Sequence, residues 1–119
     1  MPHPPAHSSI LQLSVAETEG ALVLRLEGEF DLSGVGPVEN ALSRLSEGPA
    51  PARVVLDLSE LEFLDLSALR TILRANERGR AVGCEVVVVR PRGTANRVFT
   101  LTRAGEELRM IDRLDPGWA

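Results

Sequence analysis

The sequence has no lysine or tyrosine, and among its 119 residues there are one tryptophan, three phenylalanines, one cysteine and two histidines. All 13 basic residues are therefore arginine, which excludes a Schiff-base lysine and a P-loop lysine. The lone Cys84 excludes an internal disulfide, and its place before a buried strand suggests a structural thiol. Both histidines, His3 and His7, lie in a proline-rich start, where we expect neither a buried zinc site nor a catalytic triad.

Few aromatic side chains and a net charge of −4 argue against a general nucleic-acid binder. No apolar run approaches the roughly 20 residues of a membrane helix, and the start lacks the basic and apolar regions of a signal peptide. No glycine-rich dinucleotide or phosphate motif follows a strand. We therefore expect a cytoplasmic protein that has no cofactor or metal, does not insert into membranes and is not an enzyme.

Length and composition are those of one ordinary globular domain, with 44% hydrophobic and 25% charged residues. Residues 1–9 combine proline with small and polar residues and are expected to form a flexible leader. Residues 10–119 are expected to form the single domain.

The first half of that domain predicts a hairpin followed by a helix. Residues 10–15 and 21–27 alternate between apolar and polar side chains around Glu19–Gly20, which predicts two paired strands. Residues 28–34 are expected to be a turn-rich link, and the apolar spacing predicts a helix over 35–47.

Valine-rich runs in the second half predict two buried strands, at 53–58 and 85–89, each feeding a helix. A link over 59–63 is expected between the first of these strands and its helix. Residues 93–101 predict a further helix, and 106–114 fit either a short helix or a final strand. The expected fold is a single α/β domain, a mixed sheet of four or five strands with three to four helices packed against it. The expected core comprises Val55, Leu56, Leu69, Ile72, Leu73, Val87 and Val88.

Ser67 stands where a buried strand has ended and a helix begins. Its side-chain oxygen is expected near the N-cap, accepting an otherwise unpaired backbone N–H. Arg70, Arg74 and Arg78 follow at four-residue steps and predict one basic stripe on that helix. The stripe is either a solvated helix face or part of a docking surface that starts one turn from Ser67.

The segment 57–70, DLSELEFLDLSALR, resembles the hallmark of the STAS domain (sulfate transporter and anti-sigma factor antagonist), which reads close to DLSxVxFLDSSGLG. The family signature GELD is similar to Gly28-Glu29-Phe30-Asp31. The resemblance covers about residues 10–114.

The resemblance implies a bacterial anti-sigma factor antagonist: a regulatory module that binds an anti-sigma factor with serine kinase activity, is switched off by serine phosphorylation and is restored by a serine phosphatase. By position the phosphorylated residue is Ser67; Leu66 replaces the first serine of the motif and Ala68 replaces its glycine. The residues expected to bind the partner are Glu29, Asp31, Asp65, Leu66, Ala68, Arg70 and Arg74. The chain is expected to be a monomer or weak dimer.

Two other functions remain open at this point. The chain could be a non-phosphorylated STAS subunit of another assembly, such as a lipid-transport complex or a stress-signalling scaffold. It could also be an unrelated small-molecule binder or enzyme, which would need a deep polar pocket that the sequence does not indicate.

Overall fold

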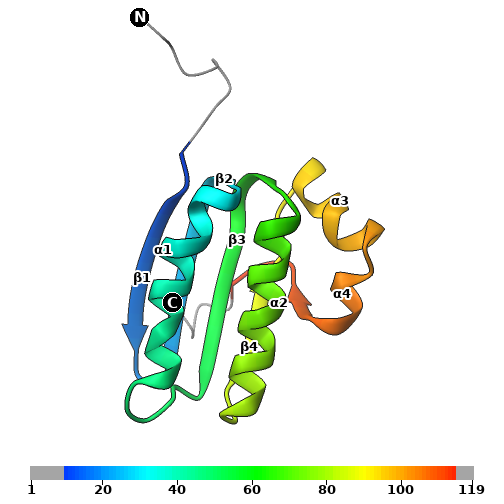
Figure 1. The fold of residues 1–119 in the computed structure, drawn as a ribbon. Coiled ribbons are helices and arrows are strands. Elements are labelled where there is room, and N and C mark those ends of the chain that lie inside the picture. The colour runs from blue at the N-terminus through cyan, green and yellow to red at the C-terminus, as the bar shows by residue number, and fades with distance from the viewer. Residues whose placement is uncertain (1–9, 115–119) are drawn as a thin grey trace, which may run out of the picture.

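The computed structural model describes residues 10–114, and the predicted leader lies outside them. Five strands form one sheet in the order β1-β2-β3-β4-β5 (Figure 1). The strands are β1 (Gln12–Thr18), β2 (Ala21–Phe30), β3 (Arg53–Leu64), β4 (Glu85–Val89) and β5 (Arg109–Ile111). The helices are α1 (Leu32–Leu42), α2 (Leu66–Ala81), α3 (Thr94–Leu101) and α4 (Ala104–Glu107), with a 3-10 turn, η1 (Ser43–Ser46), after α1.

The sheet is mixed because its first pair is a hairpin and its other pairs are parallel. Thr18 and Ala21 close the β1–β2 hairpin, and Gly20 in the turn between them has a φ of +84°, a backbone conformation that glycine adopts without strain. The pairs β2–β3, β3–β4 and β4–β5 are all parallel. The predicted α/β domain with a mixed sheet is therefore confirmed.

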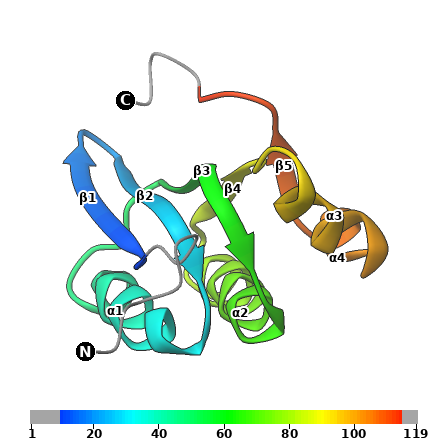
Figure 2. The same ribbon diagram turned by 90° about the horizontal axis from the view of Figure 1, so that it is seen from above.

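All helices belong to one layer because each parallel connection steps to the next strand in the same direction. Right-handed crossovers then place every connecting helix on the same face of the sheet. Figure 2 shows α1 and α2 side by side under β2 and β3, with α3 and α4 at the β5 end. Within residues 10–114, no helix is long and apolar enough to cross a membrane.

One large apolar cluster joins the helices to the sheet. Its largest fully buried side chains include Phe30 from β2, Phe99 from α3 and Ile72 from α2. The predicted core residues are buried, with one correction: Leu73 is only partly buried and packs against the margin of the cluster. The helical spacing identified the correct face of α2 but did not separate its centre from its edge.

Strands β2 and β3 run further than their sequence patterns predict. The expected links over 28–34 and 59–63 are wrong, because Phe30 and Leu64 are buried and end the two strands side by side. Two register shifts, between Arg25 and Glu27 and between Gly28 and Glu29, keep the strands paired where the apolar–polar alternation fails.

Two helices also differ from their predicted bounds. The helix expected over 35–47 starts at Leu32 and ends as an α-helix at Leu42, followed by the 3-10 turn. Residues 106–114, expected to form either a short helix or a final strand, contain parts of both, since α4 ends at Glu107 and β5 begins at Arg109.

Candidate partner-binding site

The carboxyl ends of β2 and β3 bring the starts of α1 and α2 together at one rim of the sheet. Phe30 pairs with Leu64 in register, and the Asp65 N–H donates to the Phe30 carbonyl at 3.2 Å. Each strand passes directly into its helix through one aspartate, Asp31 before α1 and Asp65 before α2. The rim therefore carries residues that are 34 positions apart in the chain.

Asp65, not Ser67, is the N-cap of α2. Its Oδ1 accepts the Ala68 N–H at 3.0 Å and the Ser67 hydroxyl at 2.6 Å. Asp65 has the extended backbone of an N-cap, with a φ of −108°, whereas Ser67 is already the second helical residue. The predicted capping role of Ser67 is wrong: its hydroxyl donates a proton to the cap instead of accepting a backbone N–H.

The pKa of Asp65 reflects this arrangement. Partial desolvation at the rim opposes ionisation, but hydrogen bonds from the Ser67 hydroxyl and the Ala68 and Ser67 N–H groups outweigh it. The pKa of Asp65 therefore lies below its ordinary value of 3.8. At neutral pH the hydroxyl of Ser67, a half-buried residue, is held against an ionised carboxylate.

Asp31 caps α1 in the same manner. Its Oδ1 accepts the Ser33 N–H at 3.0 Å and the Ser33 hydroxyl at 2.6 Å. Among the predicted partner-binding residues, Asp31 and Asp65 thus lie close together at the rim. Glu29 is half-buried on β2 and pairs in register with Phe63.

Large apolar side chains are exposed around these two helix starts. Leu66 is 59% exposed, Leu32 is 73% exposed and Phe63 is 47% exposed. Leu32 and Phe63 were missed in the sequence, because only the strand pairing shows that they share a rim with Leu66. Ala68 is fully buried, so its side chain is not available to a partner in this structure. The expectation that Ala68 contacts a partner is corrected accordingly.

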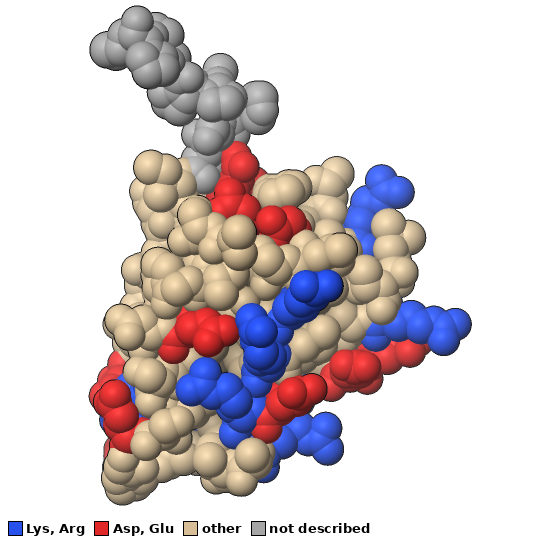
Figure 3. All heavy atoms as spheres, viewed as in Figure 1, with Lys and Arg blue, Asp and Glu red and all other residues tan. Residues whose placement is uncertain are grey.

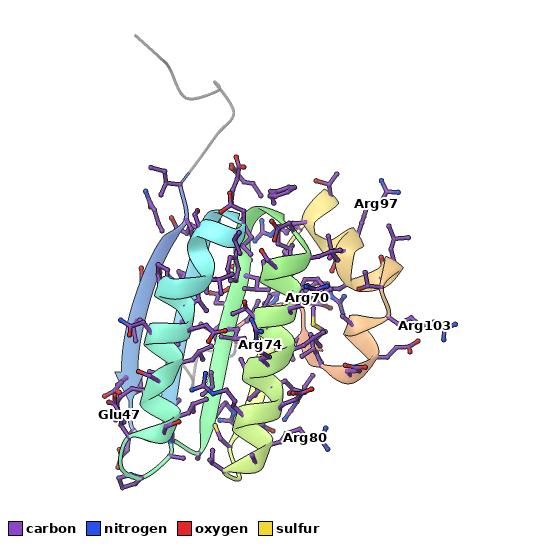
Figure 4. The ribbon with its side chains drawn as sticks, viewed as in Figure 1. Glu47, Arg70, Arg74, Arg80, Arg97 and Arg103 are labelled. Carbon is purple, nitrogen blue, oxygen red and sulfur yellow. The ribbon has the colours of Figure 1, made fainter. Side chains whose placement is uncertain are left out.

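A basic band follows α2 away from the rim. Figure 3 shows it down the middle of the helix-bearing face, with acidic side chains on either side. Arg70, Arg74 and Arg80 follow one another along α2 in Figure 4. Arg74 makes an ion pair with Glu39 of α1, at 3.2 Å between Nη2 and Oε1. Arg70 is exposed and lies one helical turn after Ser67.

Two other hydroxyls are poorer phosphoacceptor candidates than Ser67. Thr71 is only 1% exposed, and its hydroxyl donates to the Ser67 carbonyl at 2.9 Å. Ser59 lies inside β3, half-buried, and its hydroxyl donates to Asp57 at 2.7 Å. Ser67 therefore combines a helix start with access in a way that neither alternative does.

The Asp57 carboxylate behind Ser59 is structural. Its side chain is only 4% exposed, and its Oδ2 accepts a hydrogen bond at 3.2 Å from Arg25 Nε on the neighbouring strand. Cys84 is also buried, and this burial raises the pKa of its thiol. Within residues 10–114, no group of three histidine, cysteine, aspartate or glutamate side chains is placed to hold a metal ion.

The STAS domain model matches residues 12–116, and the chain belongs to the STAS family. A curated relative from Mycobacterium tuberculosis, the anti-sigma-F factor antagonist RsfB, is 32% identical over 88 residues. That match covers 73% of this chain and 69% of the relative.

Solved structures show the same fold. An anti-sigma factor antagonist from Mycobacterium paratuberculosis superposes with a TM-score of 0.74 and 28% identity, covering 89% of each chain. The phosphorylated form of the Bacillus cell fate determinant SpoIIAA superposes with a TM-score of 0.69, covering 91% of this chain and 95% of that one. At 24% identity, the second likeness concerns the fold alone.

Proposed function

We propose that this chain is an anti-sigma factor antagonist that binds an anti-sigma factor with serine kinase activity and is released when that kinase phosphorylates Ser67. The observation that carries the proposal is the hydroxyl of Ser67, a half-buried residue, held at 2.6 Å on Asp65 at the rim where α2 begins. The names of its mycobacterial relatives support the antagonist role. In this role the chain is a cytoplasmic binding module and a kinase substrate, not an enzyme.

The docking surface in this proposal is centred on Leu66. Leu32 and Phe63 extend it as exposed apolar contacts, because side chains of this size gain most from burial against a partner. Polar contacts would surround this apolar centre. They would come from the carboxylates and arginines around it: Glu29, Asp31, Asp65, Arg70 and Arg74.

Phosphorylation of Ser67 changes the rim in two ways. The phosphoryl group replaces the hydroxyl proton, so the hydrogen bond from Ser67 to Asp65 is lost. It also adds −1.5 to −2 charges beside that carboxylate. A partner carboxylate at ~7 Å would be opposed by about 2 kcal/mol per charge pair at an effective dielectric of ~20. This corresponds to a roughly thirtyfold loss of affinity, and removal of the phosphate by a serine phosphatase would restore binding.

The docking surface is tested by titrating the purified anti-sigma factor into the wild type, Leu66→Ala and Leu101→Ala in a calorimeter. Leu101 is the matched control, since it is 74% exposed but lies at the end of α3. Leu66→Ala should weaken binding about tenfold or more, because a buried leucine contributes about 1.5–3 kcal/mol, and Leu101→Ala should leave the affinity unchanged. Equal losses in both variants would place the docking surface elsewhere.

The switch is tested by repeating the titration with ATP. The wild type should be released from the kinase as phosphate accumulates on Ser67, whereas Ser67→Ala should keep more of its affinity for the kinase. If ATP leaves the wild type bound and unmodified, the chain is a constitutive STAS interaction module.

A further inference from the structure

The tripeptide Asp-Leu-Ser occurs three times in the chain, at 31–33, 57–59 and 65–67. In every copy the serine hydroxyl donates to Oδ1 of the aspartate two residues earlier, at 2.6, 2.7 and 2.6 Å in chain order. The first and third copies open α1 and α2 at the rim, whereas the second lies inside β3. The recurrence is visible in the sequence, but only the fold shows that two copies stand next to each other.

The two rim copies present their side chains alike. In each, the leucine is the first helical residue and is exposed, and the serine is the second. Ser33 is more exposed than Ser67, being open to solvent where Ser67 is half-buried. The parent strands are hydrogen-bonded neighbours, which lie about 4.8 Å apart, so an enzyme seated on one helix start also faces the other.

The residues after Ser33 strengthen the likeness. The run 31–36, DLSGVG, is closer to the hallmark DSSGLG than is DLSALR at Ser67. Gly34 also has a packing role, because a Cβ there would lie 2.7 Å from Leu11 Cδ2 and 3.1 Å from Phe30 Cδ1. The close approach of α1 to β2 at Gly34 fixes Ser33 at the rim.

We propose that Ser33 is a second phosphoacceptor for the kinase that phosphorylates Ser67, an inference that rests on the proposed function. In the transfer, Ser33 Oγ bonds to the γ-phosphorus of ATP, the bond from that phosphorus to the β-phosphate oxygen breaks, and ADP leaves. The hydroxyl proton passes along the 2.6 Å hydrogen bond to the Asp31 carboxylate and from there to water.

A second phosphate would make the switch graded. Each phosphoserine adds −1.5 to −2 charges to the same docking surface, so the doubly modified chain should bind the anti-sigma factor at least about tenfold more weakly than the chain phosphorylated on Ser67 alone. A chain with a single phosphate should bind the anti-sigma factor with an affinity between those of the unmodified and the doubly phosphorylated chain.

The test uses the full chain, the anti-sigma factor kinase and ATP, with phosphates located by mass spectrometry of peptides. The substrates are the wild type, Ser33→Ala, Ser67→Ala and the double variant, and Ser33→Thr restores a hydroxyl at the first site. Ser33→Ala keeps the backbone hydrogen bond from residue 33 to Asp31, and its melting temperature is measured to check that it is folded. Ser59 is the control inside the chain, since it has the same tripeptide within a strand.

We expect two phosphates on the wild type, one on each single alanine variant, none on the double variant and none on Ser59. Phosphate on Ser67 alone, with an unmodified Ser67→Ala variant, would overturn the second site and leave the proposed function intact. Phosphate on neither rim serine would overturn both. Phosphate on Ser59 at the same rate as Ser33 would show that the tripeptide, not the rim, is recognised, and would also overturn the proposal.

Discussion

Gly79 is the position where a single added methyl group should most clearly disturb the packing of α2. It lies on the buried face of the helix, against β4, and its carbonyl accepts the Cys84 N–H at 2.7 Å. A Cβ on residue 79 would lie 2.3 Å from Val86 Cγ2 and 3.3 Å from the Cys84 carbonyl oxygen. Neither atom can easily move away, because Val86 is a buried, β-branched side chain and the other atom is backbone.

Two opposing effects decide whether Gly79→Ala raises or lowers the free energy of unfolding. Replacing glycine by alanine in the interior of a solvent-exposed helix stabilises the helix by up to about 1 kcal/mol. Overpacking a buried contact typically costs about 1–3 kcal/mol. Because the new methyl group would approach Val86 far inside normal van der Waals separation, we expect overpacking to dominate and the free energy of unfolding to fall by about 1–2 kcal/mol.

Urea denaturation of Gly79→Ala, Val86→Ala and the double variant measures this effect. The double variant should lose less than the sum of the two single losses, with an interaction energy of at least about 0.5 kcal/mol, because shortening Val86 makes room for the new methyl group. Glu77→Ala, exposed on the same helix, is the control and should change stability by less than about 0.5 kcal/mol. A Gly79→Ala variant as stable as the wild type would refute the reasoning.

Three further predictions concern the cap, the core and the thiol. Folding lowers the pKa of Asp65, so the ionised side chain stabilises the fold above pH 3.8, the ordinary pKa, and this stabilisation is lost as the pH falls through the folded pKa. Melts at decreasing pH should therefore show a smaller loss of stability for Asp65→Asn than for the wild type. Asp65→Ala, which removes the helix cap, should cost about 1 kcal/mol at pH 7. Ile72→Ala should cost about 2–5 kcal/mol in denaturant and Leu73→Ala clearly less, since only Ile72 is fully buried. Cys84 should react with a maleimide only on unfolding, because it is buried and its thiol pKa is raised; rapid labelling of the native chain would contradict this.

The local sequence pattern predicted those elements in which all residues favour the same secondary structure. The valine run of β4 was predicted with its observed bounds, 85–89, because a continuous apolar run suits a strand buried on both faces. The end of β3 was missed because Glu60 and Glu62 are exposed and look like a loop. Their place in a strand depends on pairing with β2, which no local pattern contains.

The candidate site shows the same division. Ser67 was placed correctly at a helix start, but aspartate and serine both cap helices well, and only the observed backbone of Asp65 identifies which one does. The exposure of Leu32 and Phe63 beside Leu66 depends on which strands are neighbours. The three Asp-Leu-Ser copies were present in the sequence, and the fold alone distinguishes the strand copy from the two at the rim.

The central claim is that a phosphate on Ser67 controls binding to the anti-sigma factor. It is tested most directly by two dissociation constants for that partner, one with the unmodified chain and one with phosphoserine installed at position 67 during synthesis, which needs no kinase. The account predicts that the phosphoserine chain binds roughly thirtyfold more weakly or worse. Equal dissociation constants for the two chains would contradict it.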